Sequence, residues 1–416
     1  MKLLAHGVTH VGRKRKHNED ALLIDDSVGL YVVADGVGGH AAGEVASNKA
    51  VEVIRRVIAE NADEFARYGA RNEDFDLRDK CQALVEGAVQ QASAEIFAMA
   101  REDETKRGMG TTCVVLVRAG AKAIVGHVGD SRVYLLRSGE AYQITEDHTL
   151  VNEQYKQGLI TLEEAVSASF SNVITRCVGY QEAVQVDTLL TDLLPGDRFL
   201  LCSDGLSEYV RDEEWAEFLG ARAVEDLPGK LVDLANHRGG RDNITALVVA
   251  VEAPREEDVK AEVEARMDAL RRIPLFKHLK YKEMIQVFSI VRTESIEAGQ
   301  AIIEEGKEGD TLYVLLRGEA EVTKAGTKMA EFSAGQHFGE MALIDNAPRS
   351  ASIRAITDST ILTIDRDSFY GLMRKDSVLA VKLLWAFLQV LTGRLRATSE
   401  DLTGALMAAQ ERSSSE

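Results

Sequence analysis

Four aspartates of this sequence stand at the ends of apolar runs, each beside glycine or a small residue. Asp35 ends "LYVVAD", Asp130 follows "AIVGHVG", Asp204 follows "RFLLCS", and Asp242 precedes "NITALVV". A carboxylate that ends a buried strand needs a cation, hydrogen-bond donors or a proton, because burying it unpaired is costly. If the four converge, divalent cations would satisfy them. Ligation by oxygen alone favours magnesium or manganese over zinc.

The chemistry that such a site supports is hydrolysis. Two divalent cations about 3.5 to 4 Å apart activate water near neutral pH and stabilise charge on a phosphoryl or acyl group. Glycine lets the backbone approach closely, so the carbonyl of Gly36 is a further candidate ligand. In "GRKRKH" the guanidinium of Arg15 could fork onto phosphate oxygens. An isolated Asp-Gly pair would indicate only a turn, and the repetition of the pattern is what favours a site.

The elements that position these residues are predicted from periodicity. Residues 1–252 alternate strand-like runs such as "GLYVVAD" and "TTCVVLVRAG" with helix-like segments at 41–61 and 79–101. This alternation predicts an α/β domain with a sizeable sheet core. Residues 253–274 are charged with one apolar face, which predicts a linker helix.

The composition changes from about residue 275. Seven glycines within 41 residues separate short strand-like pieces, which indicates a β-barrel or jelly roll over much of 275–400. Helical sequence follows from about 367, and residues 401–416 are expected to form a polar tail. A chain of 416 residues also exceeds one hydrophobic core, so at least two domains are expected.

Charge and composition exclude other classes of function. A net charge of −18 argues against a nucleic-acid-binding surface. The most apolar helical stretch, 378–391, is interrupted by Lys382 and is shorter than the roughly 20 residues that a bilayer requires. The four cysteines are far apart, have no zinc-binding spacing and are expected to be reduced, and the N-terminus lacks a signal peptide. We therefore expect a cytoplasmic protein with no membrane or nucleic-acid partner.

Eight motifs of residues 1–252 resemble those of one family: "RKHNED", "VVADGVGGHAAGEVAS", "GMGTTCVVLV", "VGHVGDSRVYLLR", "ITEDHTL", "NVITRCVG", "LCSDGL" and "GGRDNITALVV". In order and context they are similar to the metal-dependent serine/threonine protein phosphatases of type 2C in their bacterial form. The resemblance implies a sandwich of two mainly antiparallel sheets flanked by helices, with the metals in a cleft at one end. It also implies phosphoprotein substrates, the products of a serine/threonine kinase.

The resemblance assigns roles to the candidate residues. Asp35 would bridge two Mn²⁺ or Mg²⁺ ions, the Gly36 carbonyl would bind the second, and Asp204 with Asp242 would complete the first. Asp130 would bind a third, looser metal together with Asp204. Arg15 would bind phosphate, while Glu19 and Asp20 would hold metal-bound waters.

Three points of the mechanism follow from the same resemblance. Water activated by the metals would attack phosphorus in one step, so no Cys or Ser nucleophile is required, and Cys202 is expected to be a core residue. Residues 150–176 occupy the place of a mobile flap beside the cleft. The general acid stays open between His40 and metal-bound water, because Val37 follows the Asp-Gly pair where some members carry a histidine.

Residues 275 to about 400 resemble a cyclic-nucleotide-binding domain, an eight-stranded β-roll with helices at both ends. The resemblance rests on "PLFKHL", "GQAIIEEGKEGDTLYVLLRGEAEV" and the "FGE…PRSA" segment. It implies Glu340 on the ribose 2′-hydroxyl, Arg349 on the cyclic phosphate, and the backbone of Gly339, Met341 and Ala342 around the ligand. Ser350 favours cyclic AMP over cyclic GMP, because Thr often stands there in domains that prefer cyclic GMP.

The sequence thus predicts a Mn²⁺- or Mg²⁺-dependent phosphatase of phosphoserine and phosphothreonine, regulated by a cyclic nucleotide. The alternative is a constitutive phosphatase whose C-terminal domain is a ligand-free docking or dimerising module. The oligomeric state and the sign of the regulation stay open.

Overall fold

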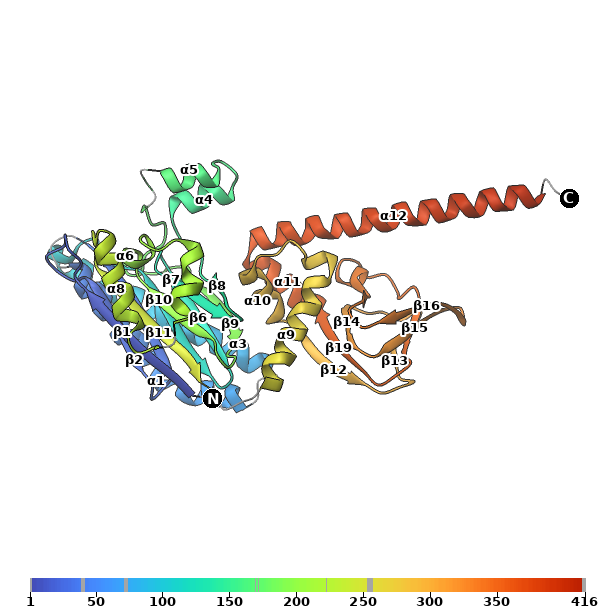
Figure 1. The fold of residues 1–416 in the computed structure, drawn as a ribbon, viewed down its shortest axis with the longest axis horizontal. Coiled ribbons are helices and arrows are strands. Elements are labelled where there is room, and N and C mark those ends of the chain that lie inside the picture. Colours follow the sequence, from blue (N-terminus) through green and yellow to red (C-terminus); the bar gives the residue numbers. More distant parts are fainter. Residues whose placement is uncertain are drawn as a thin grey trace. The chain divides into compact units, whose positions relative to one another are not determined.

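The computed structural model describes residues 2–38, 42–70, 74–168, 170, 172–221, 223–252 and 257–413. The chain forms two compact units, Met1–Lys260 and Ala261–Glu416. Each unit has its own sheets and its own core, and Figure 1 gives the order of their elements along the chain.

The first unit is built on two sheets of antiparallel strand pairs. One sheet has the order β1-β11-β10-β7-β8, with bounds Lys2–His10, Ile244–Glu252, Arg198–Cys202, Arg132–Arg137 and Glu140–Gln143. The other has the order β2-β3-β5-β6-β9, with bounds Asp20–Asp25, Leu30–Val37, Cys113–Ala119, Lys122–Val128 and Asp187–Asp192. The short strand β4, Gly110–Thr111, pairs with β3. The predicted two-sheet fold is confirmed.

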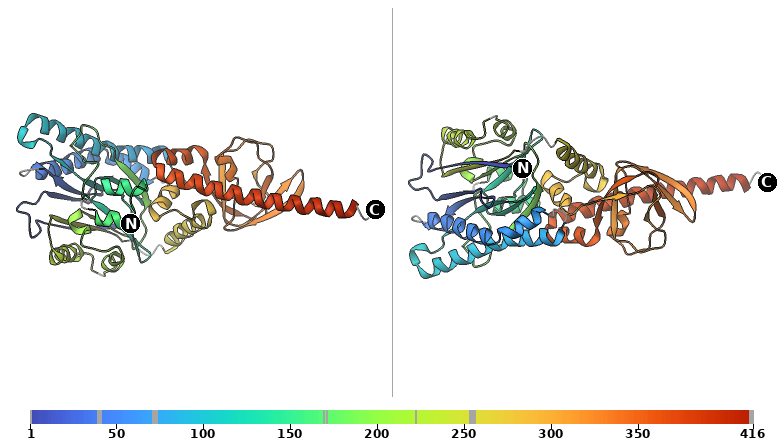
Figure 2. Two further views of the ribbon diagram at one scale, coloured as in Figure 1. Left: turned by 90° about the horizontal axis from the view of Figure 1, so that it is seen from above. Right: turned by 90° about the horizontal axis from the view of Figure 1, so that it is seen from below.

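Helices cover the outer face of each sheet (Figure 2). Helices α1 and α3 pack on the sheet of β3, and α8 packs on β11 and β1 of the other sheet. The bounds in this unit are α1 Ala42–Glu60, α2 Ala62–Ala70, α3 Phe75–Glu102, α4 Leu150–Lys156, α5 Leu162–Ser167, α6 Asp204–Ser207, α7 Trp215–Leu219 and α8 Leu227–Arg238. Two 3₁₀ turns lie at Glu104–Lys106 and Asp212–Glu214.

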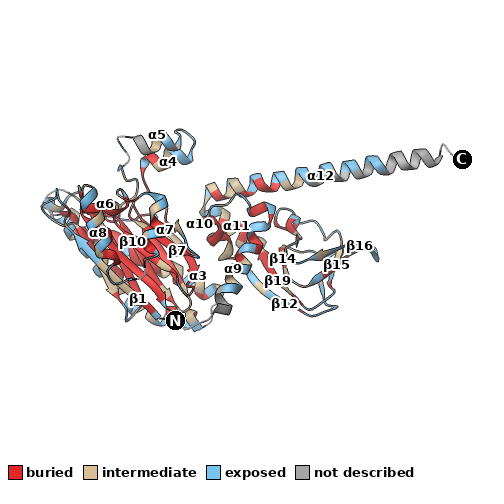
Figure 3. Ribbon diagram, in the orientation of Figure 1, coloured by how far each residue is buried: buried red, intermediate tan, exposed pale blue. Residues whose placement is uncertain are grey.

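The sequence explains why the sheets are central. Residues 30–34 of β3 are all buried, as expected for a strand covered on both faces. Figure 3 likewise shows β10, which belongs to the other sheet, as mostly buried. In α1 the buried residues Ala46, Ala50, Val53 and Ile54 recur at helical spacing, and the small alanines let the helix lie close to the sheet. Helix α3 begins at an N-cap, where the Asp74 side chain accepts a hydrogen bond from the Leu77 amide.

The second unit contains two four-stranded antiparallel sheets, β12-β19-β14-β17 and β13-β18-β15-β16. Their bounds are β12 Arg292–Ile296, β13 Ala301–Ile303, β14 Thr311–Arg317, β15 Glu319–Lys324, β16 Thr327–Ser333, β17 His337–Phe338, β18 Ser352–Ala355 and β19 Ser359–Asp365. Between β15 and β16, Ala325 and Gly326 have φ values of 48° and 78°, the positive pair of a tight hairpin turn. The predicted β-rich domain with flanking helices is confirmed.

The helices around these sheets are α9 Glu257–Arg272, α10 Tyr281–Phe288, α11 Arg366–Lys375 and α12 Ser377–Ser413, with 3₁₀ turns at Pro274–Phe276 and Glu340–Leu343. Helix α12 continues to Ser413, so most of the segment expected as a tail is helical. Its residues "ALMAAQ" have high helix propensity, which favours a helix over an irregular tail. Among the described residues, no helix is both long enough and apolar enough to cross a membrane.

Candidate metal and phosphate site

The four aspartates lie at strand ends, as their sequence context predicts. Asp35 lies near the end of β3, and Asp130 follows β6. Asp204 begins α6 directly after β10, and Asp242 precedes β11. Each carboxylate is therefore attached at or next to the end of a strand of the sandwich. The strand fixes the backbone of the aspartate better than a free loop would.

Three of these carboxylates, all partly buried, interact strongly with one another and with their neighbours. The pKa of Asp35 is raised well above its usual value, first by burial and then by the charges of Asp20, Asp204 and Asp130. Burial and the charge of Asp204 raise the pKa of Asp130 to about 8. The pKa of Asp204 is also raised, by burial and by the charge of Asp242. Like charges held this close require protons or cations.

Asp20 adds a carboxylate whose oxygens differ in their partners. Its Oδ2 accepts hydrogen bonds from Ser203 Oγ at 2.8 Å and from Thr245 Oγ1 at 2.6 Å. Its Oδ1 is buried without a hydrogen-bond partner among the described residues. Burial raises the pKa of Asp20 to about 7. An orphaned carboxylate oxygen among other carboxylates is what a hard cation or its water shell would satisfy, so this oxygen-only donor set fits Mn²⁺ or Mg²⁺.

The backbone at Gly36 runs against α1 and the segment before β2. A Cβ atom at this position would lie 2.2 Å from the carbonyl oxygen of Gly43 and 2.6 Å from that of Glu19. The Gly36 amide donates to the same Glu19 oxygen at 3.2 Å. Only glycine therefore lets the end of β3 enter the site this closely.

Arg15 reaches the site from the loop between β1 and β2. Its Nη2 lies 2.7 Å from Asp242 Oδ2, and about half of its side chain is exposed. The loop is held by Asn243, which the sequence analysis missed. Its Nδ2 donates to the carbonyls of Val11 at 3.0 Å and His17 at 2.9 Å, and its Oδ1 accepts from the Glu19 amide at 2.8 Å. Asn243 thus fixes both ends of the loop that carries the guanidinium.

The segment expected as a flap contains α4 and α5. At its base, residues 148–150 pair with residues 173–175 in antiparallel fashion. The Leu150 amide donates to the Val173 carbonyl and the Thr175 amide to the His148 carbonyl, both at 2.8 Å. The side chains of Leu159 and Val173 are exposed. His40, considered as general acid, lies outside the described residues.

The four cysteines are free, as predicted. Burial raises the pKa of the Cys202 thiol to about 12, which leaves no thiolate near neutral pH. Cys202 is therefore a core residue of β10 and not a nucleophile.

In the second unit the residues predicted to contact nucleotide lie on one continuous segment, residues 338–353, which we call the cassette. Gly339 has a φ of 78° and begins the 3₁₀ turn that carries Glu340, Met341 and Ala342. Glu340 and Ala342 are buried, whereas Met341 and Ser350 are exposed. Arg349 folds back onto the start of this turn, where it donates to the carbonyl of Gly339, the residue before Glu340.

The contacts of Arg349 are with backbone oxygens and an aromatic ring. It donates to the Gly339 carbonyl at 3.3 Å and to the Thr311 carbonyl at 2.9 Å, and its guanidinium lies 5.7 Å from the centre of the Tyr313 ring. Carbonyl acceptors are weaker partners for a guanidinium than a phosphate. Arg349 can therefore exchange them for an anion without losing an ion pair.

Comparison with known proteins agrees with this geometry. Residues 7–230 match the profile of the family described as Protein phosphatase 2C, and residues 293–376 match that described as Cyclic nucleotide-binding domain. A serine/threonine phosphatase of Listeria innocua is 35% identical over 245 residues, which are 58% of this chain and 93% of the relative. The serine/threonine protein phosphatase PstP of Mycobacterium tuberculosis is 37% identical over 240 residues, covering 58% of this chain and 43% of that protein.

Solved structures give the same result for the first unit. A crystal structure of the Mycobacterium tuberculosis phosphatase PstP superposes with a TM-score of 0.54 at 34% identity, covering 61% of this chain and all of that one. A PstP catalytic domain in complex with two manganese ions superposes with a TM-score of 0.51 at 34% identity, covering 60% of this chain and 99% of that one.

Proposed function

Because this chain belongs to the protein phosphatase 2C family and is a serine/threonine phosphatase, we propose that its substrates are phosphoproteins made by a serine/threonine kinase and that a cyclic nucleotide regulates it. The observation that carries the catalytic half is the convergence of Asp35, Asp130 and Asp204, whose pKa values are raised first by burial and then by the charges of neighbouring carboxylates. Four free cysteines suit a reducing compartment, so we place the activity in the cytoplasm.

Two Mn²⁺ or Mg²⁺ ions fit the carboxylate set, and a third can be accommodated by Asp130. In this proposal the carboxylates of Asp35, Asp204 and Asp242 and the carbonyl of Gly36 would hold the pair. When bound, the ions supply Lewis acidity that activates water and neutralises phosphoryl charge.

The chain's own groups have separate tasks. The guanidinium of Arg15 uses one N–H group to bind Asp242, and its remaining N–H groups can orient phosphate oxygens. Asp20, fixed by Ser203 and Thr245, presents Oδ1 to water in the site. Asn243 holds the Arg15 loop, so the guanidinium is preorganised and does not have to be ordered on binding.

For the second unit we propose that Arg349 binds the cyclic phosphate and Glu340 the ribose 2′-hydroxyl, with the backbone of Gly339, Met341 and Ala342 lining the ligand. Ser350 favours cyclic AMP. The support is the placement of a buried carboxylate beside a guanidinium that is held by carbonyls and not by an acid.

A route from the cassette to the C-terminal helices passes through Arg366 at the start of α11. Its Nε donates to the Ala342 carbonyl at 2.7 Å and its Nη2 to the Asp345 carbonyl at 2.6 Å. A change in the cassette on binding would therefore move α11. Coupling to the phosphatase through residues 254–274 requires different nucleotide affinities in the active and inactive states, typically by about 1 to 3 kcal/mol.

Hydrolysis of p-nitrophenyl phosphate by the full chain tests the catalytic half. We expect activity with Mn²⁺, none after chelation, and a loss of at least about 100-fold in Asp35→Asn, because the substitution neutralises, at nearly the same shape, a carboxylate that would hold the ions. Asp233→Asn, which alters an exposed carboxylate of α8, is the control. Equal rates in Asp35→Asn and the control would reject the proposed centre.

A further inference from the structure

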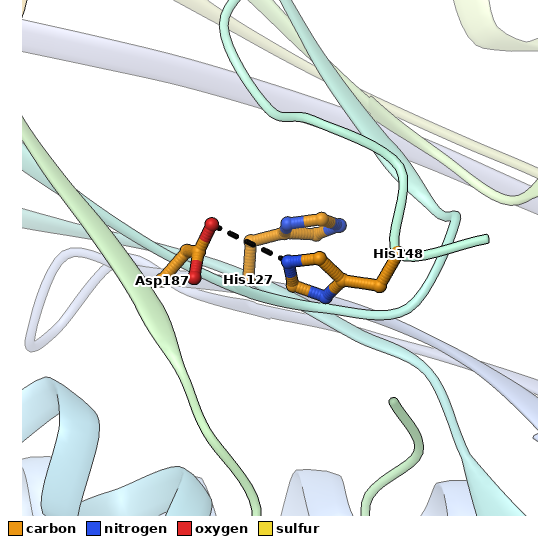
Figure 4. A group of neighbouring side chains, drawn as sticks. All are labelled: His127, His148 and Asp187. Atoms are coloured by element: carbon orange, nitrogen blue, oxygen red, sulfur yellow. Dashed lines mark ion pairs between the residues drawn. The ribbon is translucent and has the colours of Figure 1, made fainter. Parts of the chain in front are cut away.

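His127, His148 and Asp187 form a compact cluster beside the carboxylate site, and Figure 4 shows their side chains converging. Each offers a potential ligand atom, and these atoms lie within 4.8 Å of one another. His127 comes from β6 and Asp187 from β9, whereas His148 precedes α4. By composition the cluster resembles a zinc site, so its hydrogen bonds must decide what it does.

The hydrogen bonds argue against a metal. The amide of Gly129 donates to His148 Nδ1 at 3.1 Å, so this nitrogen is an acceptor and the neutral ring carries its proton on Nε2. That Nε2 lies 3.3 Å from Asp187 Oδ2. A metal-binding histidine instead donates from its second nitrogen. Arg176 Nη1 also lies 2.8 Å from Asp187 Oδ1 and 3.1 Å from His148 Nε2, where it would repel a cation.

His148 also fixes the backbone of Gly129 through two hydrogen bonds. The His148 amide donates to the Gly129 carbonyl at 2.8 Å, and the ring accepts from the Gly129 amide. Gly129 has a φ of 102°, and a Cβ atom there would lie 2.6 Å from the Thr112 side chain. Both hydrogen-bonding groups of this glycine are thus held by one histidine, directly before Asp130.

His148 also faces the flap. Its carbonyl accepts from the Thr175 amide at 2.8 Å, and the next residue, Thr149, caps α4 by accepting from the Asn152 amide at 3.3 Å. The base of the flap and the Gly129–Asp130 turn are therefore joined through a single residue.

We propose that His148 is a positioning residue for the phosphatase, whose Nδ1 holds the Gly129–Asp130 turn so that the Asp130 carboxylate can bind its metal. The inference rests on the metal-binding role proposed for Asp130. Asp187, itself held by Arg176, faces the protonated Nε2 and fixes the ring, which leaves Nδ1 as the acceptor.

Two substitutions of His148 test the roles of its two ring nitrogens separately. In His148→Asn, the amide oxygen occupies about the position of Nδ1 and can accept from Gly129, whereas in His148→Gln the amide reaches the position of Nε2 and cannot. Metal-free full-length protein is titrated with Mn²⁺, and free Mn²⁺ is measured by electron paramagnetic resonance. We expect His148→Gln to weaken the weakest site by about 10-fold and His148→Asn to stay within about 3-fold of wild type, the range typical of residues that orient ligands.

A double-mutant cycle distinguishes positioning from a general loss of structure. In an Asp130→Asn background, His148→Gln should have no further effect on Mn²⁺ binding. Equal weakening by both His148 variants, or an undiminished effect of His148→Gln in that background, would overturn the inference. If His148→Gln does not fold, His148→Asn decides alone, since 10-fold weaker binding would contradict the role of Nδ1. Unchanged binding in Asp130→Asn alone would instead reject the proposed role of Asp130.

Discussion

Removing the metal should make the stability of the protein fall as pH rises. The pKa of Asp130 lies at about 8 and that of Asp20 at about 7, against ordinary values near 3.8. Between about pH 5.5 and 6.5 the metal-free folded chain keeps these two protons, whereas the unfolded chain has released them. A group whose pKa is raised on folding contributes stability below its unfolded pKa, and this contribution is lost as pH rises through the folded pKa.

The magnitude follows from the two protons. Each proton that only the folded state holds changes the free energy of unfolding by about 1.4 kcal/mol per pH unit, so the pair gives roughly 3 kcal/mol, to which Asp35, whose pKa is also raised, adds. For a domain of this size 1 kcal/mol shifts the melting temperature by about 2–4 °C, and the expected fall is therefore roughly 6–12 °C per pH unit. With Mn²⁺ bound the carboxylates are ionised in the folded state, and the dependence should disappear.

The assay is thermal unfolding in EDTA and in Mn²⁺ at pH 5.5 and 6.5. Titration of groups outside the site affects both conditions alike, so the difference between them isolates the carboxylates. Asp130→Asn should remove about 1.4 kcal/mol per pH unit of this dependence in EDTA, whereas Asp233→Asn should leave it unchanged. A stabilisation by Mn²⁺ that is the same at both pH values would refute the electrostatic reasoning.

Three further predictions concern single residues. Gly36→Ala should abolish Mn²⁺-dependent turnover, because its Cβ would lie 2.2 Å from a carbonyl oxygen of α1, whereas Gly229→Ala, with nothing within 4 Å, should turn over normally. Asp197→Ala should lower the free energy of unfolding in urea by about 3–5 kcal/mol. The reason is that the buried guanidinium of Arg137, whose Nη2 lies 2.6 Å from Asp197 Oδ2, would lose its ion-pair partner. Arg349→Lys should weaken cyclic AMP binding in calorimetry by about 10-fold or more, because lysine lacks the planar fork; equal affinity would exclude a bidentate contact.

The carboxylates could be predicted from sequence because each signal is local. An acid that ends an apolar run, as Asp204 does after "RFLLCS", is visible without knowledge of the fold. The helix and strand periodicities likewise indicated β3, α1 and α3. Helix α2 was missed because its nine residues follow α1 with only one residue between them.

The supporting residues could not be predicted because their partners are distant in sequence. Thr245 donates to Asp20 across 225 positions, and Asn243 donates to Val11 across 232. A polar residue inside or beside an apolar strand is a weak signal, since threonine and asparagine are also common in strands and turns. Their roles emerge only when the sandwich brings β1, β2 and β11 together.

The central claim, a phosphatase governed by a cyclic nucleotide, is tested most directly by one rate measurement. Hydrolysis of a phosphopeptide with Mn²⁺ is followed in the full chain while cyclic AMP or cyclic GMP is titrated, in wild type and in Arg349→Ala. We predict a saturable change in the wild-type rate, at lower concentrations of cyclic AMP than of cyclic GMP, and no change in Arg349→Ala. Equal rates in both proteins at every concentration would contradict the claim and favour a docking role for the second unit.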